Sequence, residues 1–294
     1  MPFAKTSRIT LAFETFGDDS HPALLLIMGL ATQMIGWPDS FCRMLAERGL
    51  YVIRFDNRDC GLSSKFDHMG VPDVVKLTAA ASAGKKVQPP YQLTDMAADG
   101  ILLLDRLGIE AAHVCGLSMG GIIAQIMALN HADRLRNLIS MQSTTGEMDL
   151  EGARPEATKA LMSMPPLNRE KYLDHMAWVY GAFSGGSAAY DAVFQRRLSA
   201  AAYDRAFYPI GFTRQMAAIL ATPGRRKALA NVKTPSLVLH GDSDSLLTLA
   251  HARDTADAIP NARLVVVPQL GHGMAYPSLW PEMVAAIADH VLRI

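Results

Sequence analysis

Short apolar runs alternate with amphipathic stretches in the first part of the chain. Apolar and polar residues alternate from Arg8 to Phe16, and an uninterrupted apolar run extends from Ala23 to Met28. The first pattern is typical of an exposed strand and the second of a buried one. A helix from about Pro38 to Arg48 then leads to another apolar strand, Tyr51 to Phe55. These patterns predict a strand, helix, strand unit.

The same order recurs along the chain. A helix from about Thr94 to Leu107 precedes a strand at His113 to Cys115, and a helix from about Met119 to Asn130 precedes a strand at Leu138 to Met141. Elements that alternate in this way form a mostly parallel sheet with helices on both faces, which binds ligands at the carboxyl ends of its strands. The sequence therefore predicts an α/β fold.

The alternation stops near Thr145 and resumes with a strand at Ser236 to His240. Between them the sequence predicts several helices rich in Met, Tyr and Phe. We interpret residues 146–231 as a helical cap (lid) inserted into a core domain of residues 1–145 and 232–294. An ordinary helical core is an equal alternative, because Met and aromatic residues at helical spacing usually just pack.

After the cap we expect a helix near Ala250 to Ala258, a strand at Arg263 to Val267 and a terminal helix from about Pro281. These elements complete the expected sheet and its flanking helices.

One serine stands between two glycines at the end of a predicted strand. The segment Gly116-Leu117-Ser118-Met119-Gly120 joins a short apolar strand to a helix that begins at once. This arrangement is typical of a nucleophile elbow, in which Gly116 and Gly120 avoid clashes with neighbouring backbone. The following helix N-terminus favours the negative charge that develops during attack. We therefore expect Ser118 to be a nucleophile.

A serine hydroxyl is weakly nucleophilic at neutral pH, so Ser118 needs a histidine base and a carboxylate that orients this base. The order along the chain in this fold is serine, acid, histidine. We select His272, which lies in the glycine-flanked loop Leu270-Gly271-His272-Gly273, just past the strand that ends at Val267. Other histidines precede Ser118, precede a plausible acid, or lie in helices where a solvated or capping role is expected: His21, His68, His113, His131, His175, His251 and His290.

The acid should follow the preceding strand, where Gly241-Asp242-Ser243-Asp244 offers two carboxylates. Spacing alone does not choose between Asp242 and Asp244. One of them would hold the imidazole, and the other would serve in the turn or as a helix cap.

The elbow, the Gly-x-x-Asp loop and the glycine-flanked histidine, in this order, resemble the α/β-hydrolase superfamily. The resemblance implies that Asp244 is the acid, because it lies three residues after Gly241 and two before the apolar pair Leu246-Leu247. It also implies an oxyanion hole formed by two backbone N–H groups. Met119 supplies one. Leu30 supplies the other, although the superfamily commonly has His-Gly where this chain has Met28-Gly29.

Several core motifs narrow the resemblance further. Met28-Gly29, Gly36-Trp37-Pro38, Asp56-Asn57-Arg58-Asp59 and the elbow look like those of bacterial aclacinomycin methylesterase-type hydrolases, which remove a methyl ester from an aromatic polyketide. In the superfamily pattern a glycine stands where this chain has Asp59. We expect a structural role for Asp59, because Asp tolerates left-handed backbone. The substrate does not follow from the fold.

Charge and cysteine content limit the partners. The 28 basic and 28 acidic residues cancel, so no broad field attracts nucleic acid or an anionic membrane, and we expect a neutral small-molecule ester as substrate. No apolar run approaches the roughly 20 residues of a membrane-spanning helix. The first ten residues contain no apolar leader pattern, and three scattered cysteines argue against a disulfide framework. We therefore expect a cytoplasmic protein whose cysteines pack as small apolar residues.

The sequence contains no close-spaced His/Cys cluster, phosphate-binding Gly-Lys loop or dinucleotide fingerprint, so we expect neither a metal nor a cofactor. The expected activity is cleavage of a carboxylic ester through an acyl-enzyme intermediate. Lactonase, C–C bond hydrolase and perhydrolase activities remain alternatives, as does a non-catalytic ligand-binding homologue. Dehalogenase and epoxide hydrolase activities are disfavoured because those members of the superfamily have an aspartate in place of Ser118. No motif predicts the oligomeric state.

Overall fold

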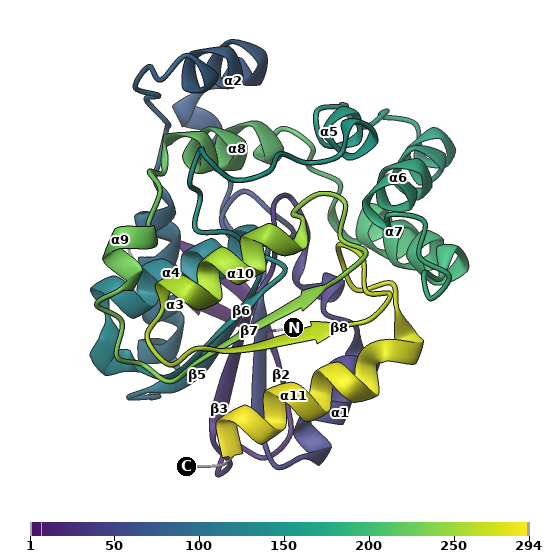
Figure 1. Ribbon diagram of the computed structural model, residues 1–294. Coiled ribbons are helices and arrows are strands. Elements are labelled where there is room, and N and C mark those ends of the chain that lie inside the picture. Colours follow the sequence, from purple (N-terminus) through teal and green to yellow (C-terminus); the bar gives the residue numbers. More distant parts are fainter. Residues whose placement is uncertain (1, 7, 293–294) are drawn as a thin grey trace.

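The computed structural model of the chain describes residues 2–6 and 8–292 and is built around an eight-stranded sheet (Figure 1). Its strand order is β1-β2-β4-β3-β5-β6-β7-β8. Strand β2 runs antiparallel to its neighbours β1 and β4, and the other neighbouring pairs are parallel. The strands are β1 (Phe3–Lys5), β2 (Thr10–Phe16), β3 (Ala23–Ile27), β4 (Tyr51–Phe55), β5 (Ala112–Leu117), β6 (Leu135–Met141), β7 (Ser236–Gly241) and β8 (Arg263–Val267). The predicted mostly parallel α/β fold is confirmed.

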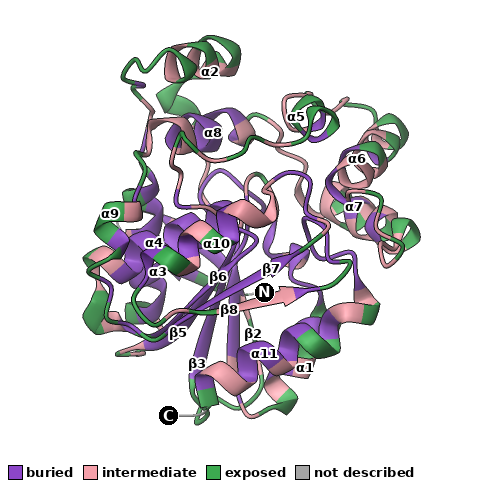
Figure 2. Ribbon diagram, in the orientation of Figure 1, coloured by how far each residue is buried: buried purple, intermediate pink, exposed green. Residues whose placement is uncertain are grey.

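Helices cover both faces of this sheet (Figure 1). One face carries α1 (Asp39–Glu47) and α11 (Trp280–Leu292), and the other carries α3 (Leu93–Arg106), α4 (Met119–Asn130) and α10 (Leu249–Ala258). The side chains of β3 alternate between the two resulting cores. Leu24 and Leu26 pack into one core, and Leu25 and Ile27 pack into the other. This two-sided burial explains the solid apolar run, and it leaves the sheet buried beneath outer helix surfaces that are exposed (Figure 2).

Two expectations at the level of single elements are wrong. Strand β2 does not alternate between exposed and buried positions, because Leu11, Ala12 and Phe13 are all buried. The unpredicted strand β1 pairs with it and covers its outer edge. His251 is not a solvated or capping residue either. It is buried on α10, and its ring nitrogens lie 2.9 Å from Thr144 Oγ1 and from the Glu151 carbonyl.

Helices fill the segment between β6 and β7, whose residues are all described. They are α5 (Pro155–Leu161), α6 (Arg169–Phe183), α7 (Ala192–Ala206), α8 (Gly211–Ala221) and α9 (Arg226–Leu229). Helices α6 and α7 pack on each other, whereas α8 packs on α3 and on α2 (Val74–Ser82), a helix that the sequence pattern did not reveal. Helix α9 contacts α4 and α10. The inserted segment therefore divides into helices beside the sheet edge, α5 to α7, and helices docked on the core, α8 and α9 (Figure 1).

The three cysteines, Cys42, Cys60 and Cys115, are buried and form no disulfide. Burial raises the pKa of the Cys42 thiol to about 12 and raises the pKa values of the other two thiols as well. They pack as small apolar residues, as expected. Within the described residues, no helix combines the length and apolar character that crossing a membrane requires.

Candidate active site

The turn between β5 and α4 holds Ser118 in a conformation that L-residues rarely adopt. Its φ is 56° and its ψ is −118°. The backbone packs so closely here that a Cβ on Gly116 would lie 1.9 Å from the Gly120 carbonyl oxygen. A Cβ on Gly120 would lie 2.1 Å from the Ile27 carbonyl oxygen. Both glycines are therefore required by close backbone approach, and the strained turn points to function at Ser118.

The loop after β3 lies directly beside Ser118. A Cβ built on Gly29 would be 3.2 Å from the Ser118 Cβ, and Leu30 and Met119 line the same cavity as Ser118. Among the described residues, the backbone N–H groups of Leu30 and Met119 donate to no protein acceptor. The Met119 amide also belongs to the N-terminus of α4, where the helix dipole favours an anion. This corner of the cavity can therefore stabilise a developing oxyanion.

Asp244 and His272 meet at the carboxyl edge of the sheet. His272 Nδ1 lies 2.7 Å from Asp244 Oδ2, and both side chains are buried. The other oxygen of Asp244 accepts the N–H groups of Leu246 and Leu247 at 2.9 and 2.8 Å. The exposed Asp242 instead accepts the Gln269 N–H at 2.7 Å. The geometry thus associates Asp244 with the imidazole and gives Asp242 a turn role.

Ser118 and His272 line one cavity, so the predicted nucleophile and base face the same space. In the described chain they are not joined by a hydrogen bond, and nucleophile–base contacts are often loose before substrate binds. Because Nδ1 of His272 faces Asp244, Nε2 is the ring nitrogen that can take a proton. Helix α6 supports this ring, since the His272 N–H donates to the Phe183 carbonyl at 3.1 Å and the two rings form an edge-to-face contact at 5.9 Å.

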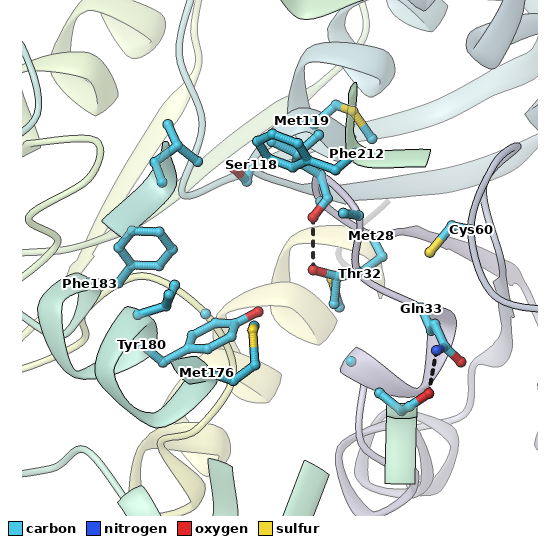
Figure 3. A pocket seen from close by; sticks show the side chains of 18 of the residues that line it. Met28, Thr32, Gln33, Cys60, Ser118, Met119, Met176, Tyr180, Phe183 and Phe212 are labelled. Atoms are coloured by element: carbon cyan, nitrogen blue, oxygen red, sulfur yellow. Dashed lines mark hydrogen bonds between the residues drawn. The ribbon is translucent and has the colours of Figure 1, made fainter. Parts of the chain in front are cut away.

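The cavity has a volume of about 320 Å³ and mostly apolar walls. Figure 3 shows Met176, Tyr180 and Phe183 of α6 facing Ser118 and Met119 across it. The volume and lining are those of a site for a small hydrophobic molecule. In residues 2–6 and 8–292, no group of three or more His, Cys, Asp or Glu side chains is arranged to hold a metal ion.

Sequence reasoning missed Gln142, which follows β6 with a φ of 46° and is fully buried. Its Oε1 accepts the Gly273 N–H at 2.7 Å, and its Nε2 donates to the Gly273 carbonyl at 3.3 Å. Gln142 therefore holds the loop that carries His272. A polar residue directly after a buried strand, at the edge where ligands bind, is the signal that could have revealed it.

His240, at the end of β7, was also missed. Its Nε2 lies 2.7 Å from the Leu247 carbonyl oxygen and 3.5 Å from Asp244 Oδ2. Burial lowers the pKa of His240, which disfavours a second positive charge beside Asp244.

The segment that follows β4, residues 56–59, connects the site to the inserted helices. Asp59 has a φ of 60°, which agrees with the structural role expected for it, and it forms a buried ion pair with Arg214 of α8. Asn57 Nδ2 donates to the Met28 carbonyl at 2.9 Å. The segment therefore connects α8 with the loop that lies beside Ser118.

Sheet order, elbow and cavity together define a hydrolase of the α/β type. The family model described as alpha/beta hydrolase fold matches residues 22–277, and the chain belongs to this family. Similar curated proteins include the rhodomycin D methylesterases DauP of Streptomyces sp. (strain C5) and DnrP of Streptomyces peucetius. Each is 30% identical, and each alignment covers 96% of this chain and 95% of the relative. These relatives bear out the prediction of an ester-cleaving enzyme and the resemblance to methylesterases.

More distant similarities include one further curated relative and two solved structures. The 3-oxoadipate enol-lactonase 2 of Acinetobacter baylyi is 25% identical, with 88% of this chain and 85% of the relative covered. The crystal structure of the enol-lactonase from Burkholderia xenovorans LB400 has a TM-score of 0.72 at 22% identity, covering 99% of this chain and 100% of that chain. A hydrolase from Pseudomonas aeruginosa PA01 has a TM-score of 0.71 at 23% identity, covering 99% and 97% of the two chains. The two structures show the fold.

Proposed function

We propose that this protein hydrolyses a carboxylic ester of a neutral, hydrophobic small molecule through an acyl-enzyme intermediate on Ser118. The observation that carries the proposal is the buried Asp244–His272 hydrogen bond at the wall of the apolar cavity that also contains Ser118. A serine on a strained turn, beside an imidazole oriented by a carboxylate, is suited to acyl transfer.

In the proposed mechanism the Ser118 hydroxyl attacks the ester carbonyl while His272 Nε2 accepts its proton. The N–H groups of Leu30 and Met119 stabilise the resulting oxyanion. His272 then returns the proton to the departing alcohol, and Asp244 stabilises the imidazolium. A water molecule, activated by the same ring, attacks the acyl-enzyme and releases the acid.

Methyl esters of larger hydrophobic acids are the substrates that we propose first. The methylesterase relatives and the apolar cavity of about 320 Å³ support this choice. Opening of a lactone is the second candidate, supported by the 3-oxoadipate enol-lactonase relative, because the same attack cleaves a cyclic ester. A panel of methyl esters and lactones, compared by kcat/KM, separates the two candidates.

We also propose that residues 146–231 form a cap inserted into a core domain of residues 1–145 and 232–294. The segment between β6 and β7, whose regular elements are all helices, supports this division. The outermost limits, residues 1 and 294, lie outside the described residues. We further propose that the protein is located in the cytoplasm, which its three free, buried cysteines support. We propose no nucleic-acid or membrane partner.

Substitution of the proposed catalytic residues tests this function. We expect Ser118→Ala to lower kcat/KM for a p-nitrophenyl ester by at least about 10³-fold and to abolish labelling by a fluorophosphonate. Asp244→Asn should lower it by about 10²–10⁴-fold, because the imidazole loses its orienting carboxylate. Asp242→Asn is the matched control and should leave the rate unchanged. Undiminished turnover by Ser118→Ala would refute the proposal.

A further inference from the structure

The loop beside Ser118 is held at both of its ends by the segment that follows β4. At the first end, Asn57 Nδ2 donates to the Met28 carbonyl at 2.9 Å. At the second end, the Met34 N–H donates to Asp56 Oδ1 at 2.8 Å. The middle of the loop needs a separate support, because Ala31 has a φ of 51°, a conformation that is unfavourable for alanine.

Gln215 of α8 supplies this support. Its Oε1 accepts the Ala31 N–H at 2.7 Å, and its Nε2 donates to the Arg58 carbonyl at 2.7 Å. The side chain is fully buried, so no solvent replaces either hydrogen bond. One amide thus joins the loop beside Ser118 to the segment after β4, and it also occupies the Ala31 N–H. The preceding N–H, that of Leu30, stays available to a ligand.

Two buried contacts fix the position of helix α8, and therefore the position from which Gln215 reaches Ala31. Arg214 Nε and Nη2 lie 2.8 Å from the two carboxylate oxygens of Asp59, and both side chains are buried. A Cβ on Gly211 would lie 1.9 Å from the Asp59 carbonyl oxygen, so the start of α8 rests against the same turn. A buried bidentate ion pair restricts the orientation of its partners, and α8 therefore presents Gln215 at a defined position.

Gln215 itself does not line the cavity, although its helix does. Phe212 and Met216 of α8 face the cavity, and Gln215 points to the loop instead. Because its side chain lies outside the cavity, we expect any effect on the reaction to pass through the loop.

We propose that Gln215 is a positioning residue of the oxyanion hole: it holds the Leu30–Ala31 peptide so that the Leu30 N–H faces the reacting carbonyl. The inference rests on the function proposed above and extends it to a residue of the inserted segment. A positioning residue of this kind acts mainly on the tetrahedral intermediate, which binds the oxyanion hole more strongly than the neutral ester does.

The test compares Gln215→Met with Gln215→Glu. Methionine has a similar length and loses both hydrogen bonds, whereas glutamate keeps an acceptor for the Ala31 N–H and loses the donor to Arg58. We expect Gln215→Met to lower kcat by about 10–100-fold with KM changed by less than about threefold, because only the transition state uses the oxyanion hole fully. Gln215→Glu should have a kcat between those of Gln215→Met and the unsubstituted protein.

A second readout separates positioning from general loss of structure. A trifluoromethyl ketone forms a hemiketal oxyanion on the serine, so its affinity for Gln215→Met should fall by about the same factor as kcat/KM. The matched control is Gln125→Met on α4. Gln125 is also fully buried and makes two side-chain hydrogen bonds, to Ser140 Oγ at 3.0 Å and from Arg225 Nε at 3.2 Å. This control should lower the Tm without lowering kcat.

Unchanged kcat or unchanged ketone affinity in folded Gln215→Met would overturn the proposal. So would an equal loss of kcat in Gln125→Met. If Gln215→Met does not fold, Gln215→Glu decides by the same two measurements. The proposed function is tested separately, because retained turnover in Ser118→Ala would refute it whatever the result for Gln215.

Discussion

Two sets of ion pairs in the same inserted segment lie in opposite environments. Helix α8 buries Arg214 completely and pairs it with the buried Asp59. Helices α6 and α7 are joined by exposed ion pairs, in which Arg169 contacts Asp204 and Arg196 contacts Asp174. The first arrangement resembles a protein core, and the second resembles a protein surface.

The difference indicates which ion pairs of this enzyme can be substituted without loss of stability. Breaking one partner of a buried ion pair leaves an uncompensated charge, which is costly. Exposed ion pairs contribute little, because solvent and salt screen them. The buried pair of α8 is therefore expected to be essential to the fold around the site, whereas the exposed pairs between α6 and α7 can vary. Helix α7 also has a largely buried pair of its own, between Arg205 and Asp56.

The largest effect is expected on α8. Arg214→Met should lower the free energy of unfolding by about 3–5 kcal/mol, because Asp59 is left buried without its partner. Chemical denaturation followed by circular dichroism measures this loss. The double variant Asp59→Asn/Arg214→Met should be more stable than Arg214→Met alone. A loss below about 1 kcal/mol in Arg214→Met would show that the buried pair contributes no more than the exposed pairs between α6 and α7.

The buried sheet should also differ from α6 in its response to acid. Burial on β5 lowers the pKa of His113 from 6.5 to about 4. The unfolded chain therefore binds this proton first, and stability falls as the pH drops from about 6.5 to 4, by at most about 3 kcal/mol. His113→Gln should flatten this part of the curve of Tm against pH.

His175 on α6 provides the comparison. Partial burial lowers its pKa too, but its side chain is only half-buried. His175→Gln should therefore change the acid dependence of the Tm less than His113→Gln does. The opposite order would remove the contrast between the sheet and α6.

A substitution on the cavity face of α6 should act on substrate selection. Met176 faces Ser118 across the cavity and is half-buried (Figure 3). For a bulky hydrophobic ester, Met176→Ala should raise KM by about fivefold, since about 1 kcal/mol of apolar contact is lost. The kcat for a p-nitrophenyl acetate should stay within about twofold. Equal losses for both substrates would place Met176 among the residues that support catalysis itself.

The smallest effect is expected at the exposed ion pairs. Arg196→Ala removes contacts with Asp174 and Glu170, at 2.6 and 3.2 Å. It should lower the free energy of unfolding by less than about 1 kcal/mol, and even less in high salt. Thermal unfolding at two salt concentrations measures this. A loss as large as that of Arg214→Met would contradict the surface-like character of the contact between α6 and α7.

Local sequence patterns determined much of this protein. The apolar runs predicted the parallel strands, because a strand covered on both faces needs apolar residues at successive positions. The elbow around Ser118 was visible because the turn requires Gly116 and Gly120 within a few residues of it. The loop of His272 was visible for a similar reason, as a glycine-flanked segment directly after a strand.

Only the tertiary structure decided how these pieces are supported. Spacing alone left Asp242 and Asp244 open, and the family resemblance favoured Asp244 before the contact with His272 was seen. Gln215 left no pattern, and Gln142 left only its position directly after a buried strand, because a glutamine amide can bind any backbone segment within its reach. The contact between Ala31 and Gln215 joins residues 184 positions apart. Such contacts depend on how helices pack in the folded protein. They cannot be predicted from the residues that are neighbours along the chain.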